Sequence, residues 1–321
     1  MSSTRPNILW IYIEDQDPRY GCYGEPLVAT PNIDSLAEQG VVFERAYSPA
    51  PVCSPSRSAV ITGSYAIRVG VHVQRSSRFP GEEIYLPDGV KTVPELFREA
   101  GYFTFNRGKD DYNFAYDRSD LYSTGNDATD PGAMKGVQAG SGDWSECPPD
   151  TPFFAQMQTN GGKHGYSLDG VAAAMQKLGV EQPELVNPED VTVPPQYPDI
   201  PEMREMVAAQ LSTMLVSDLE VGGMIEHLKE EGRWGNTIIF LISDHGALFP
   251  RAKQMCYEEG LHIPLIVAAP GMENLQATIP SGSRRDEPTA LLDVAATSLE
   301  LAGISVPDNM DSANLFGEGP K

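Results

Sequence analysis

Residues 6–15 read Pro-Asn-Ile-Leu-Trp-Ile-Tyr-Ile-Glu-Asp, a continuous apolar run that ends abruptly in the acidic pair Glu14-Asp15. Such a run is typical of a strand that is buried on both faces of a parallel sheet. Residues 237–242 form a second run of this kind, which ends in Ser243-Asp244-His245. Open α/β sheets bind ligands at the carboxyl ends of their strands, so we expect the two acidic ends to meet at a functional site.

Helical patterns alternate with these strands along the chain. The sequence predicts further strands over residues 41–46, 102–106 and 263–268, and helices over residues 32–39, 56–62, 92–100, 201–231 and 288–302. Two stretches rich in turn-forming or proline residues, 107–152 and 180–201, are expected to be long loops. This order predicts an α/β fold with a mostly parallel central sheet flanked by helices.

The composition excludes several classes of protein. The 321 residues are 40% hydrophobic, which suffices for one large domain with a substantial core. The formal net charge of −22 argues against a nucleic-acid binder and against docking on an anionic membrane. Because neither a bilayer-spanning run nor a signal peptide is present, we expect a cytoplasmic protein, or a periplasmic or secreted one if a leader has been removed.

One cysteine stands in an unusual sequence context, Cys53-Ser-Pro-Ser-Arg57. Pro55 and Ser56 can open a helix, which would place the Cys53 thiol at the positive end of the helix dipole, and Arg57 brings a guanidinium close. A nucleophile or oxyanion at this position would be stabilised by both. The spacing of the cysteines fits neither a zinc ribbon nor a CxxC pair. Taken alone, each of the four is expected to be a free thiol that is buried or inert: Cys22, Cys53, Cys147 and Cys256.

The acids at the two strand ends suggest a metal site. If the ends converge, the carboxylates of Glu14, Asp15 and Asp244 and the imidazole of His245 make a ligand set for a hard or borderline divalent cation. Each acidic pair taken alone is equally well explained as a turn or a cap at the end of a strand.

The stretch Cys53-Ser-Pro-Ser-Arg57 matches the Cys-x-Pro-x-Arg signature of type I sulfatases, which are alkaline-phosphatase-like enzymes. Other blocks resemble this family in the same order along the chain. These blocks are residues 5–8 with Glu14-Asp15, 30–37, 101–104 with Gly108-Lys109, 243–246, 253–264 and 291–303. The resemblance therefore spans nearly the whole chain.

The resemblance implies two cofactor features. A divalent cation, usually Ca²⁺ in this family, would be bound by Glu14, Asp15, Asp244 and His245 together with Cys53. A maturase would oxidise Cys53 to formylglycine, and one hydroxyl of the formylglycine hydrate would attack the sulfur of a sulfate ester.

Further roles are implied for residues around this nucleophile. Arg57 would hold the hydrate, and Lys109 and Lys253 would contact the sulfate oxygens. His164 is the candidate for the family histidine that acts near the leaving group, and Lys163 competes with it for that alignment.

The implied function is that of a sulfuric ester hydrolase that removes sulfate from a sulfated small molecule or carbohydrate. A phosphonate or phosphate ester hydrolase is an alternative, since the same site suits both oxyanions. An N-sulfoglucosamine sulfamidase is another, because Ser243-Asp-x-Gly246 and Phe249-Pro-x-x-Lys253 resemble sulfamidases. The alternative without catalysis is an inactive, truncated sugar-binding form.

The sequence also departs from the family. Glu14 stands where an aspartate is usual, Asp110-Asp111 follows Lys109 where Trp-His is common, and residues 160–164 replace a usual His-x-Pro-His. These changes predict a different acid/base set or substrate pocket. The chain stops soon after Gly303, so residues 1–321 are expected to form a catalytic domain without the family's smaller C-terminal subdomain.

Overall fold

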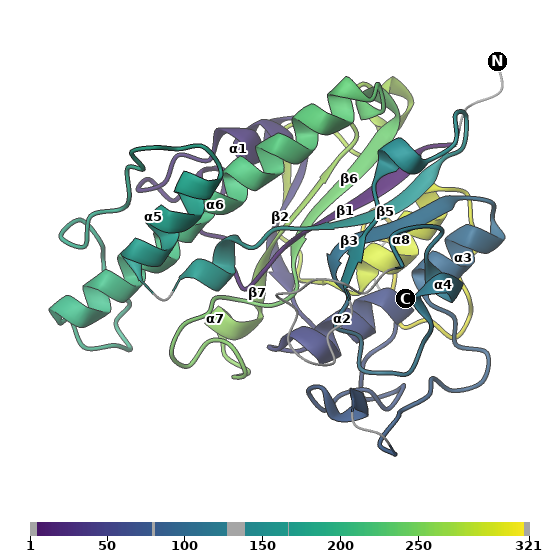
Figure 1. Ribbon diagram of the computed structural model, residues 1–321, viewed down its shortest axis with the longest axis horizontal. Coiled ribbons are helices and arrows are strands. Elements are labelled where there is room, and N and C mark those ends of the chain that lie inside the picture. Colours follow the sequence, from purple (N-terminus) through teal and green to yellow (C-terminus); the bar gives the residue numbers. More distant parts are fainter. Residues whose placement is uncertain (1–4, 79–80, 127–138, 166, 318–321) are drawn as a thin grey trace.

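The computed structural model describes residues 5–78, 81–126, 139–165 and 167–317. A single sheet forms the middle layer, with the strand order β4-β3-β5-β1-β6-β7-β2-β8 and with β9 paired to β2 (Figure 1). The strands are β1 (Asn7–Ile13), β2 (Gly40–Tyr47), β3 (Phe103–Lys109), β4 (Ala139–Ser141), β5 (Phe153–Gln158), β6 (Thr237–Ser243), β7 (His262–Ala268), β8 (Ser283–Arg285) and β9 (Thr289–Ala290).

Strand direction brings the two strand ends that precede the acidic residues, those of β1 and β6, to one edge of the sheet. The neighbours β3, β5, β1 and β6 are parallel to one another. Strand β7 is antiparallel to both β6 and β2, so β2 runs in the same direction as β6. The carboxyl ends of β1, β2, β3, β5 and β6 therefore share an edge, and the predicted α/β fold with a mostly parallel sheet is confirmed.

Helices cover both faces of the sheet (Figure 1). One face packs against α2 (Cys53–Thr62), α3 (Val93–Glu99) and α8 (Asp293–Leu301), and the other against α1 (Pro31–Glu38) and α6 (Pro201–Glu230). Helix α5 (Leu168–Lys177) packs on α6, and two short helices, α4 (Arg118–Leu121) and α7 (Glu258–Leu261), lie in connections. No helix in the described ranges is long and apolar enough to cross a membrane.

The first strand shows why its sequence is apolar throughout. Ile8, Trp10 and Tyr12 belong to the core beneath α2, α3 and α8. The alternate side chains Leu9, Ile11 and Ile13 belong to the core beneath α1 and α6. Since successive side chains of a strand point to opposite faces, a strand covered on both sides requires apolar residues at every position.

Several predicted elements are confirmed and others differ. The end of β1 at Ile13 agrees with prediction, β6 and the long helix end within one residue of their predicted bounds, and Thr92 caps α3 in a capping box with Glu95. Helix α8 begins at Asp293 rather than 288, because residues 289–290 pair with β2 instead. The central strand β5 and helix α5 were not predicted.

Of the two expected loops, the first contains regular structure and the second does not. The stretch 107–152 contains the end of β3, α4 and β4, while its residues 127–138 lie outside the described part of the chain. The stretch 180–200 has neither helix nor strand, as predicted.

Candidate active site

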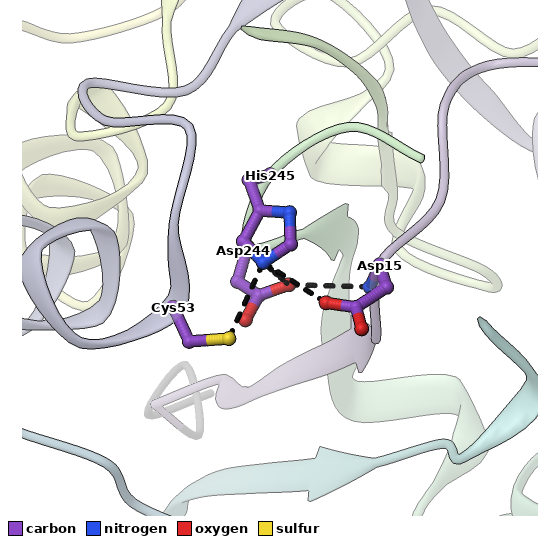
Figure 2. A group of neighbouring side chains, drawn as sticks. All are labelled: Asp15, Cys53, Asp244 and His245. Carbon is purple, nitrogen blue, oxygen red and sulfur yellow. Dashed lines mark hydrogen bonds and ion pairs between the residues drawn. The ribbon is translucent and has the colours of Figure 1, made fainter. Parts of the chain in front are cut away.

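Four side chains, from the ends of two strands and the start of one helix, meet at the carboxyl edge of the sheet. Asp15 follows β1, Cys53 is the first residue of α2, and Asp244 and His245 follow β6 (Figure 2). Their possible ligand atoms all lie within 4.8 Å of one another, and all four residues are buried. The His245 Nε2 lies 2.9 Å from an Asp15 oxygen and 3.3 Å from the Cys53 Sγ.

Strand pairing explains why the acids converge. Ile13 of β1 is in register with Ser243 of β6, so the residues that follow emerge side by side. Asp15 then turns out of the strand with a φ of 57°, a left-handed conformation that is uncommon for a residue with a side chain. Its backbone N–H donates to Asp244 Oδ1 at 3.4 Å. The predicted meeting of the two acidic strand ends is confirmed.

Cys53 occupies the start of a buried helix. Helix α2 begins at Cys53, with the extended Val52 before it, so the thiol lies at the positive end of the helix dipole as predicted. The hydroxyls of Ser48 and Ser56 donate to the Asp244 carbonyl at 2.7 and 2.5 Å, which fixes this helix end against the end of β6.

Arg57 organises the acids from within the site. Its guanidinium is 1% exposed and donates from Nε to Asp244 at 3.0 Å and from Nη2 to Glu14. Its Nη1 donates to Gln158 Oε1 at 2.9 Å, and the guanidinium lies 4.5 Å from the centre of the Tyr12 ring. These contacts hold Glu14 and Asp244 in fixed positions beside Cys53.

Three lysines contact the acids Glu14 and Asp15 of the site. The Lys109 Nζ lies 2.6 Å from Glu14, Lys163 lies 2.5 Å from Glu14 and 2.7 Å from Asp15, and Lys253 lies 2.9 Å from Asp15. Their side chains are 18%, 35% and 18% exposed, whereas those of the acids are 3% exposed or less. Ammonium groups therefore lie between the buried acids and solvent, where an anionic group would meet them.

Glu14 lies beside the group of four rather than within it. Its carboxylate contacts Arg57, Lys109 and Lys163. Burial and the neighbouring Asp244 would raise the pKa of Glu14, but these three cations outweigh both and hold it well below its usual range. Its predicted role as a cation ligand stays a prediction.

The charges around Cys53 also act on its thiol. Burial alone would raise the pKa of Cys53, but the Lys109 charge and the His245 hydrogen bond lower it to about 7. Burial would likewise lower the pKa of His245, yet Asp244 and Asp15 raise it to about 10. The surrounding charges thus favour the thiolate form of Cys53 and the protonated form of His245 next to the two aspartates.

The donor set fits a divalent cation. Asp15 and Asp244 supply carboxylate oxygens, the ligands that hard cations prefer. The His245 Nδ1 lies 2.9 Å from the Gly246 carbonyl, which can only accept, so Nδ1 carries hydrogen and Nε2 faces the cluster. A backbone acceptor on the outer nitrogen is the usual support for a histidine ligand. A cation at this position would offset the negative charge of Asp15 and Asp244, which the protonated His245 imidazole offsets in its absence.

A glycine-rich turn decides which of two neighbouring residues enters the site. Residues 161–164 form a 3₁₀ turn after β5. A Cβ at Gly162 would overlap the Glu14 carbonyl oxygen, and one at Gly161 would overlap the Ser217 hydroxyl, so only glycines allow the turn to pack this closely. The turn brings Lys163 to the acids.

His164, which follows in the same turn, is placed differently. Within the described ranges, no hydrogen bond or ion pair joins its side chain to the acids or to Cys53. Burial and Lys177 lower its pKa. His164 and Lys163 are the two candidates for the position of the family histidine near the leaving group. Of the two, Lys163 is the residue that contacts the site.

Known proteins resemble the chain over most of its length. The sequence model of the Sulfatase family matches residues 6–304. An ulvan-active sulfatase of Formosa agariphila is 26% identical over 98% of this chain and 55% of its own length. The human N-sulphoglucosamine sulphohydrolase is 26% identical over 97% of this chain and 62% of its own length. The chain thus spans between half and two thirds of these relatives.

A solved structure supports the same fold. It holds a protein in complex with its substrate D-glucosamine-2-N,6-O-disulfate, and it aligns with a TM-score of 0.67 and 19% identity over 97% of this chain and 79% of that one. The family match covers nearly the whole chain and includes both acidic strand ends and the cysteine at the start of α2. The chain belongs to the sulfatase family.

Proposed function

We propose that this chain carries the catalytic site of a sulfuric ester hydrolase that removes sulfate from a sulfated carbohydrate. Its nucleophile would be formylglycine made from Cys53 by a maturase, beside a divalent cation for which Ca²⁺ is expected. The observation that carries the proposal is the meeting of Cys53 with Asp15, Asp244 and His245 within 4.8 Å. The match to the sulfatase family and to carbohydrate sulfatases supports it.

The residues have distinct tasks in this proposal. Asp15, Asp244 and His245, with Glu14 and the modified Cys53 as further predicted ligands, would hold the cation, whose charge would offset the charge of the sulfate oxygens. Lys109, Lys163 and Lys253 would donate hydrogen bonds to those oxygens, since their ammonium groups already lie among the acids. Arg57 would keep Glu14 and Asp244 in place.

Formylglycine supplies a nucleophile that can be regenerated. In maturation the Cβ of Cys53 is oxidised: –CH₂–SH and water give –CHO, H₂S and two hydrogens, which an electron acceptor of the maturase takes up. The hydrate has two hydroxyls on one carbon. One would form the bond to sulfur while the alcohol leaves with a proton, and loss of the proton from the other would expel sulfate and restore the aldehyde.

Matched substrates separate the proposal from its rivals. The maturase-coexpressed chain should be assayed with a sulfate monoester, a phosphonate monoester and an N-sulfated glucosamine on the same leaving group or sugar. Faster cleavage of the sulfate ester supports the proposal. Faster cleavage of the phosphonate or of the N-sulfate would assign the site to those reactions, and binding without cleavage of any would support the sugar-binding form.

Calcium is expected to stabilise the fold. Three buried carboxylates side by side repel one another, and a cation that binds only the folded state stabilises it by mass action. At a hundredfold excess over its dissociation constant, Ca²⁺ should raise the melting temperature by on the order of 5 °C, and a chelator should reverse the gain. Asp244→Asn should abolish the effect, while Asp88→Asn, an exposed control, should keep it. A melting temperature that ignores both calcium and chelator would contradict the cation site.

Loss of Lys253 is expected to slow turnover. Its ammonium lies in a loop after β6 and contacts Asp15, so it can reach sulfate oxygens without supporting the core. Lys253→Ala should reduce kcat by on the order of a hundredfold, as for other preorganised charge contacts, with little change in melting temperature. Lys177→Ala, an exposed helix residue, is the control. Near-normal turnover in folded Lys253→Ala would move this role to another lysine, Lys163 first.

A further inference from the structure

Lys109 has a third carboxylate partner, Asp111. The Lys109 Nζ lies 2.6 Å from Glu14, 3.5 Å from Asp111 and 3.8 Å from Asp244. Glu14 and Asp244 are both predicted ligands of the cation. Asp111 is fully buried, and it lies outside the four residues that form the possible metal cluster in the described part of the chain.

Asp111 is itself held by a two-point ion pair. Arg75 donates from Nε to Oδ1 at 3.1 Å and from Nη2 to Oδ2 at 2.8 Å. A guanidinium that binds both oxygens of a carboxylate fixes its orientation as well as its position. The pair joins residues 36 positions apart, so it is a product of the fold rather than of local sequence.

The backbone around this pair is held in an unfavourable conformation. Asp111 has a φ of 57° and Arg75 a φ of 55°, both in the left-handed region. Two hydrogen bonds anchor these segments on α2: Ser54 N–H donates to Gln74, and Asn113 N–H donates to Ser58. A third joins the segments to each other, from the Asn113 side-chain amide to the Val73 carbonyl. Strain that is retained in this way tends to occur at functional sites.

The three partners of Lys109 respond differently to a cation. A divalent ion attracts the Glu14 and Asp244 carboxylates to itself and repels an ammonium next to them. Asp111 is not among the predicted ligands of the cation, so it would keep its attraction for Lys109. Building on the function proposed above, we propose that Asp111, clamped by Arg75, is a positioning residue that holds Lys109 in place to contact the sulfate oxygens.

The direction in which the affinity for sulfate changes in one variant tests this role. Inorganic sulfate should be titrated by calorimetry into the full chain with saturating Ca²⁺, as wild type and as Asp111→Asn. The variant loses a negative charge near the anion, which alone would tighten sulfate binding. If Asp111 positions Lys109, sulfate should instead bind about fivefold to tenfold more weakly, and kcat for a sulfate ester should fall by a similar factor.

A double variant shows whether the loss of sulfate affinity in Asp111→Asn depends on Lys109. In a Lys109→Met background, Asp111→Asn should weaken sulfate binding no further. Should Asp111→Asn fail to fold, Arg75→Gln removes the guanidinium and keeps the Asp111 carboxylate beside Lys109. This variant is expected to weaken sulfate binding about twofold to threefold, and Arg75→Lys to restore part of it.

The possible failures are distinguishable. Sulfate binding that is unchanged or tighter in folded Asp111→Asn, or equally weakened with and without Lys109, would overturn the positioning role while the proposed function stands. A wild-type chain, matured at Cys53, that neither binds sulfate nor cleaves sulfate esters would overturn both.

Discussion

Replacing Cys53 by alanine is expected to abolish sulfate ester hydrolysis, with kcat lower by roughly 10⁴-fold or more, because the nucleophile itself is removed. The fold should survive, since Cys53 is the first residue of α2 and its side chain is small. The measurement is turnover of a sulfate monoester by maturase-coexpressed protein, with melting temperature as the check on folding.

The chain offers matched cysteine controls. Cys256→Ala changes an exposed thiol and should leave turnover unaltered. Cys53→Ser keeps a hydroxyl but has only one oxygen on its carbon, so it should form a sulfated residue that is released slowly, with at most a single turnover. Steady turnover by Cys53→Ala would place the nucleophile elsewhere.

The second large effect concerns stability. Arg57→Met should lower the free energy of unfolding by about 3–5 kcal/mol, because it removes the buried guanidinium that pairs with two buried carboxylates, Glu14 and Asp244. Methionine fills most of the space of the arginine stem, so loss of charge rather than a cavity should dominate. Urea unfolding followed by circular dichroism gives the free energy.

A surface arginine provides the comparison. Arg68 pairs with Asp311, but its side chain is 52% exposed, so Arg68→Met should cost no more than about 1 kcal/mol. The difference between the two losses of unfolding free energy measures how much more a buried ion pair stabilises the fold than an exposed one. An Arg57→Met variant as stable as Arg68→Met would mean that the lysines alone compensate the acids.

The sheet and the acidic strand ends are predictable from sequence for a physical reason. Burial on both faces forces β1 and β6 to be apolar throughout, and acids that follow such runs fall on the carboxyl edge. Strand β5 escapes prediction because it carries Gln156 and Gln158. Each amide is satisfied by residues far away in sequence, Gln156 by Tyr122 and Gln158 by Arg57.

The details of the site depend on contacts that sequence spacing does not encode. The choice between Lys163 and His164 rests on how closely a turn packs against Glu14, for which the two adjacent glycines were the available signal. The Arg75–Asp111 pair joins two loops, and nothing in either loop alone indicates it. Loop geometry of this kind follows from tertiary packing rather than from local pattern.

The most direct test of the account is the mass of the tryptic peptide that spans residues 46–57 and contains Cys53. The chain should be coexpressed with a formylglycine-generating maturase and digested without prior alkylation. Conversion of the thiol to the aldehyde predicts a peptide about 18 Da lighter than the cysteine form, together with sulfate ester hydrolysis that scales with the fraction converted. A peptide that stays fully in the cysteine form while the protein hydrolyses sulfate esters at full rate would contradict it.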